Sequence, residues 1–575
     1  MNRKPKSSGV GPTRWRAIAL LVCFALGGVV LEGRMLYLQL IDNDFLAAQG
    51  DDRHLRTVQI SAHRGSITDR NGEPLAVSTP VDSIWANPQE LKPELGRLAE
   101  LARVLELDPE SLARRITSNL DREFVYLKRH LSPSQAAEVL ELDVPGVGSL
   151  REYGRYHPAG EVAGHVVGFT DIDDQGQEGL ELAYDYWLSG ETGSKRVLQD
   201  RFGRVVGDVE QIKAPRPGRT LRSSLDLRLQ YLAYRELKLA VTENRARSGS
   251  VVILDPNTGE VLAMVNQPSF NPNSRSQRDP ALYRNRAVTD IFEPGSSFKP
   301  LVLAAALETG HVTPETLIDT SPGYLSVDGR ILTEDDSNLG RISVATVLAK
   351  SSDVGSGRIA LGMEPKEIWQ VLTAFGIGRL TESGFPGESA GLLHDPSHWR
   401  AVGQATISYG YGVSVTTLQL ARAYATIAAG GILRPISFEA LDGPPRGERT
   451  LSAKTAAELL KMLQGVVSPD GTGQRAAVKN FTIAGKTGTA WISGVGGYSG
   501  DRYTAVFAGI APATKPRLVA VVVIDDPQGR AYYGGDVAAP VFSRIVSGAL
   551  RLLAVPPDAL PEPPLTVVAQ AEVDR

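Results

Sequence analysis

The chain has 575 residues, of which 42% are hydrophobic and 22% are charged, and its formal net charge is −4 at pH 7. This length predicts two or three globular units, and the composition excludes a largely disordered protein. The low net charge, together with a sequence that contains no nucleic-acid-reading motif, excludes a nucleic-acid-binding function. The single cysteine, Cys23, excludes intramolecular disulfides and a cysteine metal cluster.

An uncharged apolar segment, AIALLVCFALGGVVL at residues 17–31, follows a basic N-terminus. At about 1.5 Å per residue it is too short for a hydrocarbon core of ~30 Å, unless the helix also includes Trp15 and the MLYLQL sequence. We therefore predict a transmembrane anchor at 17–38. Because Lys and Arg residues that flank a membrane helix favour its cytoplasmic side, residues 1–16 are predicted to be cytoplasmic. A signal peptide cleaved near residues 25–28 is the alternative.

The segment after the anchor contains no pattern typical of a catalytic site. Residues 63–80, HRGSITDRNGEPLAVSTP, combine two short apolar stretches with a DRNG turn, which predicts a β-hairpin. Segments with helical periodicity, such as ELGRLAELARVLEL, follow within 88–143. Glycines and aromatics then recur without metal-ligand spacing, so His157 and His165 are predicted to be packed or hydrogen-bonded residues.

The pattern changes near residue 225. An amphipathic helix is predicted at 224–241, followed by two apolar strands joined by a DPNTGE turn within 248–268. Two further strands are predicted at 503–511 and 517–527, and a last amphipathic helix follows. The segments between the early and the late strands have helical patterns. This order predicts an α+β domain in which sequence-distant strands form one antiparallel sheet flanked by helices. The Pro-rich tail, 554–575, is predicted to be extended or disordered.

The sequence FEPGSSFKP, residues 292–300, places a serine and a lysine three residues apart at the start of a predicted helix. Ser296 and Lys299 would then share one helix face. Helix N-terminal amides favour negative charge there, and a buried lysine kept near neutrality can accept the proton of a serine. Ser-x-x-Lys is common by chance, so this motif alone predicts no activity.

Two further segments complete a recognisable set. LAKSSDVGS, residues 348–356, contains Ser351 and Asp353, and FTIAGKTGTAW, residues 481–491, is predicted to be a strand. In that strand Thr487 and Thr489 alternate to one face, where two hydroxyls beside an ammonium suit a carboxylate. Serine β-lactamases and penicillin-binding proteins carry the same set of motifs in the same order.

The sequence resembles the class B penicillin-binding proteins along nearly its whole length beyond the anchor. Its AHRG and SYGYG sequences are similar to the division-specific type, penicillin-binding protein 3, and no glycosyltransferase segment precedes the domain, which argues against class A. The resemblance implies an elongated pedestal domain at 39–224 and a transpeptidase domain at 225–553. It rests on RGSITDRNGEPLAVS, GRYHPAGEVAGHVVGF, SLDLRLQ, ILDPNTGEVLAMVNQPSFNPN, EPGSSFKP, SYGYGVSVTTLQLARAYA, AGKTGTA and YYGG.

This resemblance implies that the protein cross-links peptidoglycan and is acylated by β-lactams. Ser296 would attack the D-Ala-D-Ala bond, Lys299 would be its base, and Ser351 and Lys486 would relay a proton to the leaving amine. Which lysine acts as the base differs between accounts of such enzymes. The backbone N–H groups of Ser296 and Thr489 would form the oxyanion hole. The implied substrate-binding residues are Asp353, Thr487, Gly488, Thr489, Tyr409, Tyr503, Tyr532 and Tyr533.

The resemblance also implies a location and partners. No metal or cofactor is required, and the catalytic domain would be periplasmic on a single-pass protein of the bacterial inner membrane. The implied partners are peptidoglycan stem peptides, β-lactams and division-complex membrane proteins that include a septal glycosyltransferase. Two alternatives share the motifs, namely a weakened paralogue that acts as a division-complex scaffold and a D,D-carboxypeptidase that uses water as the acceptor.

Two positions depart from the family pattern. The second motif usually ends in asparagine, whereas here it ends in Asp353, which only accepts hydrogen bonds when ionised. An ionised Asp353 would also stabilise the ammonium form of Lys299 and make it a poorer base. We therefore expect acylation to be slowed at neutral pH and to improve in acid, unless the loop absorbs the change. The second departure is Trp491, where division-type relatives often have a basic residue.

Overall fold

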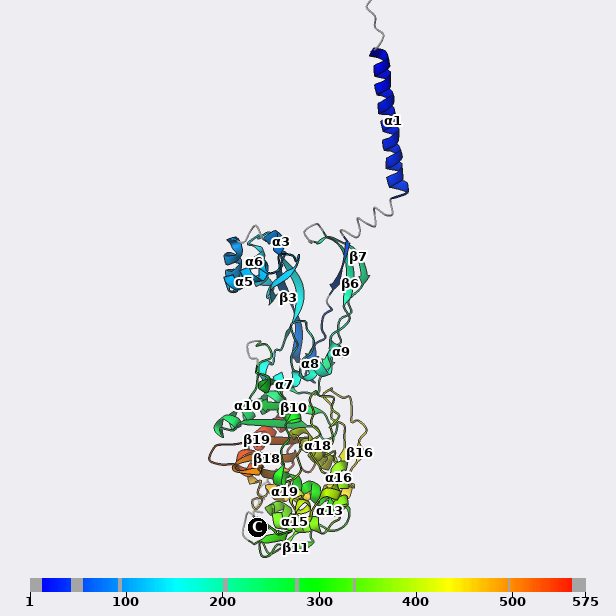
Figure 1. Cartoon of the computed structure of the whole chain (residues 1–575). Helices are drawn as coiled ribbons and strands as arrows, with labels where there is room; N and C mark the ends of the chain where they lie inside the picture. Colours follow the sequence, from blue (N-terminus) through cyan, green and yellow to red (C-terminus); the bar gives the residue numbers. More distant parts are fainter. Residues whose placement is uncertain are drawn as a thin grey trace, which may run out of the picture. The chain divides into compact units, whose positions relative to one another are not determined.

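The computed structural model describes residues 13–42, 55–60, 62–91, 96–199, 205–274, 279–334, 338–494 and 497–560 (Figure 1). Most of the predicted cytoplasmic N-terminus and Pro-rich tail lies outside the described residues. The remainder divides into two compact units with discontinuous sequences. The first contains residues up to Ala62, Pro80–Glu152 and Glu191–Arg216, and the second contains His63–Thr79, Tyr153–Gly190 and the chain from Pro217 onward.

The N-terminal helix, α1 (Thr13–Leu40), is apolar over most of its length. Its segment Arg14–Leu40 is long and apolar enough to cross a membrane, and none of its most apolar window is buried against the protein. An apolar helix without a protein partner is stable when lipid surrounds it. The helix covers the predicted anchor at 17–38 and extends beyond it at both ends.

The rest of the first unit consists of small sheets and short helices. The helices pack their apolar faces into one core that includes Leu101, Ile116, Leu127 and Val139. One sheet has the order β1-β6-β7, and β4 and β5 both pair with β3. The bounds are β1 (Leu55–Ile60), β3 (Pro74–Ala86), α3 (Pro88–Leu91), α4 (Leu98–Val104), α5 (Pro109–Thr117), β4 (Val125–Leu131), α6 (Pro133–Leu140), β5 (Val147–Tyr156), β6 (Gly193–Gln199) and β7 (Val205–Lys213). The first six residues of β3 and the last four of β5 belong to the second unit.

The second unit is built on one antiparallel sheet with the order β10-β9-β19-β18-β17. The two strands predicted near residue 250 therefore lie beside the strands predicted after residue 500, which confirms the α+β prediction. The strands are β9 (Ser248–Leu254), β10 (Val261–Gln267), β17 (Ala484–Gly494), β18 (Gly497–Ala511) and β19 (Leu518–Asp525). The predicted strand FTIAGKTGTAW begins only at Ala484, because its first residues form an isolated bridge to Val478.

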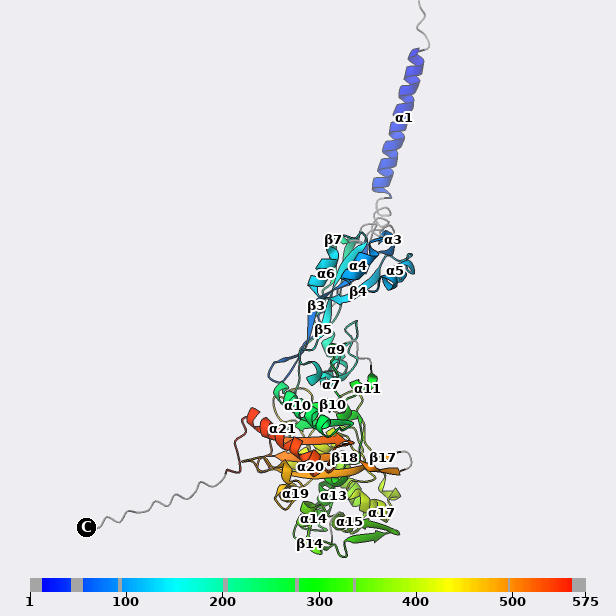
Figure 2. The same cartoon turned by 90° about the vertical axis from the view of Figure 1, so that its left-hand side faces the viewer.

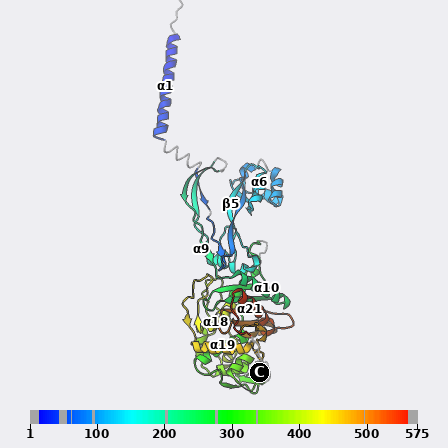
Figure 3. The same ribbon diagram turned by 180° about the vertical axis from the view of Figure 1, so that it is seen from behind.

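Helices cover both faces of this sheet, so the strands are apolar on both sides. Val252 and Leu254 face one core, while Val251 and Ile253 face the other. Residues of α10 (Leu227–Glu243) and α21 (Ala539–Leu552) share one core with Val251 and Ile253. Residues of α13 (Lys299–Glu308), which lies below β17 and β18 in Figure 2, share the other core with Val252 and Leu254. Figure 3 shows α18 (Thr417–Ala428) and α19 (Ala453–Val467) one below the other.

The remaining elements of this unit are short. The predicted hairpin at 63–80 forms, with β2 antiparallel to β3. The bounds are β2 (Ile67–Thr68), η2 (Gly160–Val162), α7 (Gly164–Val167), α8 (Gly179–Ala183), α9 (Asp185–Leu188), β8 (Leu221–Arg222), α11 (Pro280–Tyr283), α12 (Arg286–Thr289), η3 (Gly295–Phe298), β11 (Leu317–Asp319), β12 (Tyr324–Val327), β13 (Arg330–Thr333), β14 (Arg341–Ser343), α14 (Val344–Lys350), α15 (Asp353–Leu361), α16 (Pro365–Ala374), η4 (Pro396–His398), α17 (Ala401–Ile407), β15 (Ile432–Leu433), β16 (Glu448–Arg449), η5 (Gln474–Ala476) and α20 (Gly534–Val537).

A buried ionic network lies at the N-terminal end of the second unit. Arg64 Nε and Arg155 Nε lie 2.8 Å and 2.6 Å from the carboxylate of Glu181, whose side chain is fully buried. Burial alone would raise the pKa of Glu181, but His157, Arg155 and Arg64 outweigh it and lower that pKa to about 2. Removing one partner would leave an uncompensated buried charge, so such a substitution is expected to destabilise this unit.

Candidate active site

Ser296 lies on a single 3-10 turn rather than in the first α-helical turn. The turn is η3, and α13 begins only at Lys299. The prediction that both residues share the start of one helix is therefore wrong for Ser296. Their proximity is retained, because Lys299 Nζ donates to Ser296 Oγ at 3.0 Å. Lys299 is fully buried, so its ammonium depends on protein groups for its hydrogen bonds.

The hydroxyl of Ser351 links the two lysines of the site. Lys299 Nζ and Lys486 Nζ donate to Ser351 Oγ at 3.0 Å and 2.9 Å. Ser351 ends α14 with a left-handed φ of 64°. A non-glycine residue adopts this conformation only where its surroundings hold it, and such residues concentrate at functional sites. Ser296, Lys299, Ser351 and Lys486 thus form one continuous hydrogen-bonded chain.

Asp353 makes a direct ion pair with Lys299. As the first residue of α15, it places Oδ1 2.6 Å from Lys299 Nζ. Lys299 also donates to the carbonyl oxygen of Ser351 in a short hydrogen bond. The base candidate therefore contacts a hydroxyl on each side, a carbonyl and a carboxylate. These partners replace the hydrogen bonds to water that the buried amine has lost.

The Lys-Thr-Gly segment lies on β17, the edge strand of the central sheet, and runs past η3. A Cβ atom on Gly488 would lie 2.5 Å from the carbonyl oxygen of Pro294, so glycine is required for this close approach. Lys486 is fully buried. Thr487 Oγ1 lies 3.0 Å from Thr472 Oγ1, and Thr489 Oγ1 accepts from the amide of Gly534 at 2.9 Å.

A cleft of about 510 Å³ opens onto these residues. Its size is typical of a small-ligand site. Of the predicted site residues, those that line it are Ser296, Ser351, Thr487, Thr489 and Tyr533. Those that do not line it are Lys299, Asp353, Tyr409, Lys486, Gly488, Tyr503 and Tyr532. The other residues that line it are Glu334, Leu339, Lys350, Gly471, Thr472, Gln474, Arg475, Gly535 and Asp536.

The predicted tyrosines form a stack beside the cleft. The ring of Tyr532 lies 4.2 Å from that of Tyr503 and 4.4 Å from that of Tyr533. Only Tyr533 reaches the cleft wall, and Tyr409 is buried, which raises the pKa of its phenol. Trp491 continues the stack at 6.4 Å from Tyr503 and is about half exposed.

Several cleft residues were not predicted. Glu334 follows β13, and Thr472 precedes η5. Neither residue belongs to the Ser-x-x-Lys, Ser-Ser-Asp or Lys-Thr-Gly motif, and no local sequence pattern distinguishes them from surface residues. Burial raises the pKa of Glu334, although its hydrogen bonds from Ser352 and from the amide of Asp353 act in the opposite direction. Only the folded chain brings this acid to the second motif.

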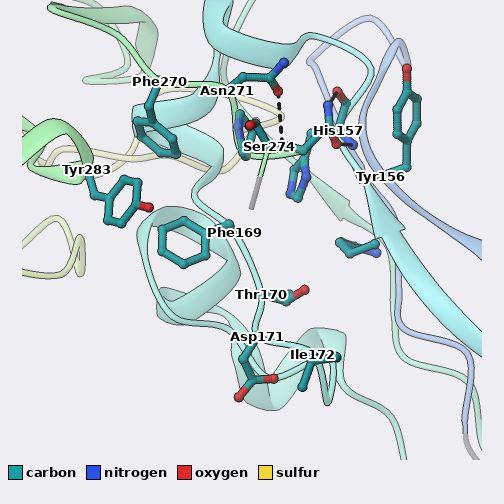
Figure 4. Close-up of a pocket in the computed structure, with 13 residues that line it drawn as sticks. Tyr156, His157, Phe169, Thr170, Asp171, Ile172, Phe270, Asn271, Ser274 and Tyr283 are labelled. Carbon is teal, nitrogen blue, oxygen red and sulfur yellow. Dashed lines mark hydrogen bonds between the residues drawn. The ribbon is translucent and has the colours of Figure 1, made fainter. Parts of the chain in front are cut away.

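A second cavity of about 510 Å³ lies near the ionic network and shares no lining residue with the cleft. Figure 4 shows Phe169, Phe270 and Tyr283 on one side of it and His157 on the other. His165 Nε2 lies 2.8 Å from the carbonyl oxygen of Leu282, and burial lowers its pKa to about 4. His165 is therefore a neutral, packed residue at pH 7.

The comparisons with known proteins agree with this geometry. Residues 249–547 match the family model of the penicillin binding protein transpeptidase domain, and residues 59–223 match that of the penicillin-binding protein dimerisation domain. The chain therefore belongs to the penicillin-binding proteins that carry a transpeptidase domain. The additional dimerisation domain places it in class B.

Particular relatives refine the comparison. The chain is 43% identical over 551 residues to peptidoglycan D,D-transpeptidase FtsI of Escherichia coli (strain K12), which covers 95% of this chain and 93% of the relative. It is 40% identical over 550 residues to probable peptidoglycan D,D-transpeptidase PbpC of Pseudomonas aeruginosa, covering 96% and 97% of the two chains.

Solved structures give the same result. The transpeptidase domain of penicillin-binding protein 3 from Burkholderia pseudomallei has 43% identity and a TM-score of 0.55, covering 59% of this chain and 98% of that one. Penicillin-binding protein 3 from Mycobacterium tuberculosis, complexed with aztreonam, has 29% identity and a TM-score of 0.68, covering 87% and 98%.

Proposed function

We propose that this protein is a membrane-anchored serine D,D-transpeptidase that cross-links peptidoglycan stem peptides at the division septum. The hydrogen-bonded chain from Ser296 through Lys299 and Ser351 to Lys486 is the observation that carries the proposal. Acyl transfer needs a nucleophile, a base and a group that returns a proton to the leaving amine. The site supplies a serine hydroxyl, a buried amine 3.0 Å from it, and a second amine connected through a relay hydroxyl.

The reaction has two steps. Ser296 Oγ forms a bond to the carbonyl carbon of the penultimate D-Ala, its proton passes to Lys299, and the bond to the terminal D-Ala breaks. Ser351 and Lys486 deliver a proton to the leaving amine. An amine of a neighbouring stem peptide then attacks the ester, forms the cross-link and releases Ser296. A β-lactam enters the first step and remains on Ser296.

The surrounding groups support roles in binding. The amides of Ser296 and Thr489 form the proposed oxyanion hole, because Thr489 on β17 runs alongside η3. Thr487, Gly488 and Thr489 bind the terminal carboxylate of the donor beside the ammonium of Lys486. Asp353 holds Lys299. Tyr533 forms part of the cleft wall and contacts Tyr532, which stacks on Tyr503. Tyr409 is buried and contacts the ring of Tyr411.

Labelling with a tagged penicillin tests the activity. The full-length protein in detergent is expected to carry one covalent label, which peptide mass spectrometry locates on Ser296. Ser296→Ala abolishes the label, while Ser326→Ala, an exposed serine on β12, retains it. A wild-type protein that stays unlabelled at saturating penicillin supports the scaffold alternative instead. Product analysis with a D-Ala-D-Ala donor and an amine acceptor then separates cross-linking from carboxypeptidase activity.

We also propose that α1 spans the inner membrane with the N-terminus in the cytoplasm and the catalytic unit in the periplasm. Arg14 and Arg16 at its N-terminal end support this orientation. In the domain arrangement proposed here, 39–224 is the pedestal, which contacts division-complex proteins including a septal glycosyltransferase, and 225–553 is the transpeptidase domain. A membrane-impermeant thiol reagent tests the orientation in a Cys23→Ser background. A cysteine added near the C-terminus is expected to react in intact spheroplasts, and one added near the N-terminus is not.

A further inference from the structure

Glu334, at the end of the β12–β13 hairpin, binds the second motif with both oxygens of its carboxylate. Ser352 Oγ donates to Glu334 Oε1 in a short hydrogen bond, and the amide of Asp353 donates to Oε2 at 3.0 Å. The two donors are the residues that directly follow the relay serine, Ser351. One carboxylate therefore holds two consecutive residues of the Ser351–Asp353 segment.

Ser352 is itself fixed by the helix that follows. It is the N-cap of α15, and its Oγ accepts from the amide of Gly355 at 2.8 Å. The side chain is buried, so its hydroxyl proton needs an acceptor within the protein. Glu334 supplies that acceptor, and the β12–β13 hairpin is thereby tied to the start of α15.

This attachment constrains the conformation of Ser351. The residue has a left-handed φ of 64° between α14 and α15, a conformation that costs free energy unless its neighbours hold it. Lys299 and Lys486 hold its hydroxyl on one side. Glu334 holds the two following residues on the other side. If that anchor is released, Ser351 can relax away from the point where its hydroxyl meets both amines.

Glu334 also affects Asp353 by charge. Asp353 directs Oδ1 to Lys299 at 2.6 Å, while its own backbone amide faces Glu334. Two carboxylates repel each other, so an ionised Glu334 favours the orientation in which the Asp353 side chain points to Lys299.

We propose that Glu334 is a positioning residue for acylation, which acts through Ser352 and the amide of Asp353 to hold Ser351 between Lys299 and Lys486. This inference rests on the proposed transpeptidase function and adds to it a residue outside all three motifs. Glu334 does not transfer a proton in the reaction. Its effect is on the geometry of the relay, so it changes the rate of the chemical step more than the initial binding of the β-lactam.

The test measures acylation of the full-length protein by a labelled penicillin, with the rate constant of the chemical step separated from initial binding. Glu334→Ala is expected to lower that rate constant by about 10- to 100-fold, which is the usual effect of misplacing a catalytic group by about 1 Å. Glu334→Gln keeps one acceptor and is expected to lose less. The exposed acid of a neighbouring segment is the matched control, and Glu315→Ala is expected to acylate at the wild-type rate.

A double-mutant cycle with Ser352→Ala separates positioning from general damage. Because both side chains act through one hydrogen bond, the double variant is expected to be little slower than Glu334→Ala alone. Additive losses would overturn the inference, as would a wild-type acylation rate in Glu334→Ala. A loss that appears only in initial binding would overturn it too. A wild-type protein without label on Ser296 would instead overturn the proposed function, so the two failures are distinguishable.

Discussion

Asp353→Asn is the substitution that best tests the chemistry of this site. In the structure Asp353 Oδ1 lies 2.6 Å from Lys299 Nζ. Opposite unit charges at that distance attract by about 6 kcal/mol at an effective dielectric constant near 20, before the cost of desolvating them is counted. If only about 1.4 kcal/mol of this attraction has to be given up when Lys299 enters the transition state, acylation becomes about tenfold slower.

Asparagine removes the charge and returns a donor for the peptide carbonyl of the substrate. We therefore expect Asp353→Asn to be acylated about tenfold faster than the wild type at pH 7.5, since a tenfold change corresponds to about 1.4 kcal/mol.

The assay is the second-order rate of labelling by a tagged penicillin, measured for both proteins at pH 7.5. Glu315→Gln is the control for removing an acidic charge elsewhere on the surface. A wild-type rate equal to the rate of Asp353→Asn would refute the reasoning. That result would mean that the loop accommodates the Asp353 carboxylate without changing the reactivity of Lys299.

Three further substitutions test the framework around the site. Gly488→Ala should slow acylation at least tenfold, because its Cβ would lie 2.5 Å from the carbonyl oxygen of Pro294 and separate β17 from η3. Tyr424→Phe should destabilise the protein by about 1–3 kcal/mol, since the buried carbonyl of Ser297 loses its 2.8 Å hydrogen bond. Burial raises the pKa of Asp174 to about 6. As the pH rises through this value the buried carboxylate becomes charged and the folded state loses stability. Asp174→Asn should therefore stabilise the protein by about 1–3 kcal/mol at pH 7.5 and have little effect at pH 4.

Each of these three substitutions has a matched control, and each has an outcome that would contradict the prediction. Gly403→Ala, on α17 where nothing lies within 4 Å of the new methyl group, should leave the labelling rate unchanged, and equal rates for both glycine variants would contradict the close approach at β17. Thermal unfolding followed by circular dichroism measures the other two. Tyr231→Phe, at an exposed phenol, should unfold like the wild type, and so should Asp173→Asn. A stabilisation by Asp174→Asn that is the same at both pH values would contradict its assignment to a raised pKa.

Much of the fold follows from local patterns in the chain. The apolar run of α1, the amphipathic α10 and the strands on either side of the DPNTGE turn are visible in the sequence, because each depends on the periodicity of its own side chains. Strand β17 begins later than its apolar pattern predicts. The hydrogen bonds of Phe481 are made to Val478 rather than to the sheet, and no local pattern reveals that choice.

The three motifs could likewise be read from the sequence, because their residue types and order carry the chemistry. Their geometry could not. The prediction that Ser296 and Lys299 share an α-helical turn is wrong for Ser296, which lies in a 3-10 turn. Both kinds of helix bring residues three apart to the same side, so the Ser-x-x-Lys spacing does not distinguish them. Tyr503 and Tyr532 were grouped with Tyr533, yet only Tyr533 reaches the cleft wall.

What the sequence by itself determined is the identity of the reacting groups, namely a serine, two lysines, a relay hydroxyl and an unusual acid at position 353. Only the tertiary structure decided that Ser351 lies within 3.0 Å of both amines, and that Glu334 binds the segment next to it. These contacts join residues from α13, α14, β13 and β17. Side-chain hydrogen bonds between distant segments depend on where the packed elements bring them, and that placement is a property of the whole core.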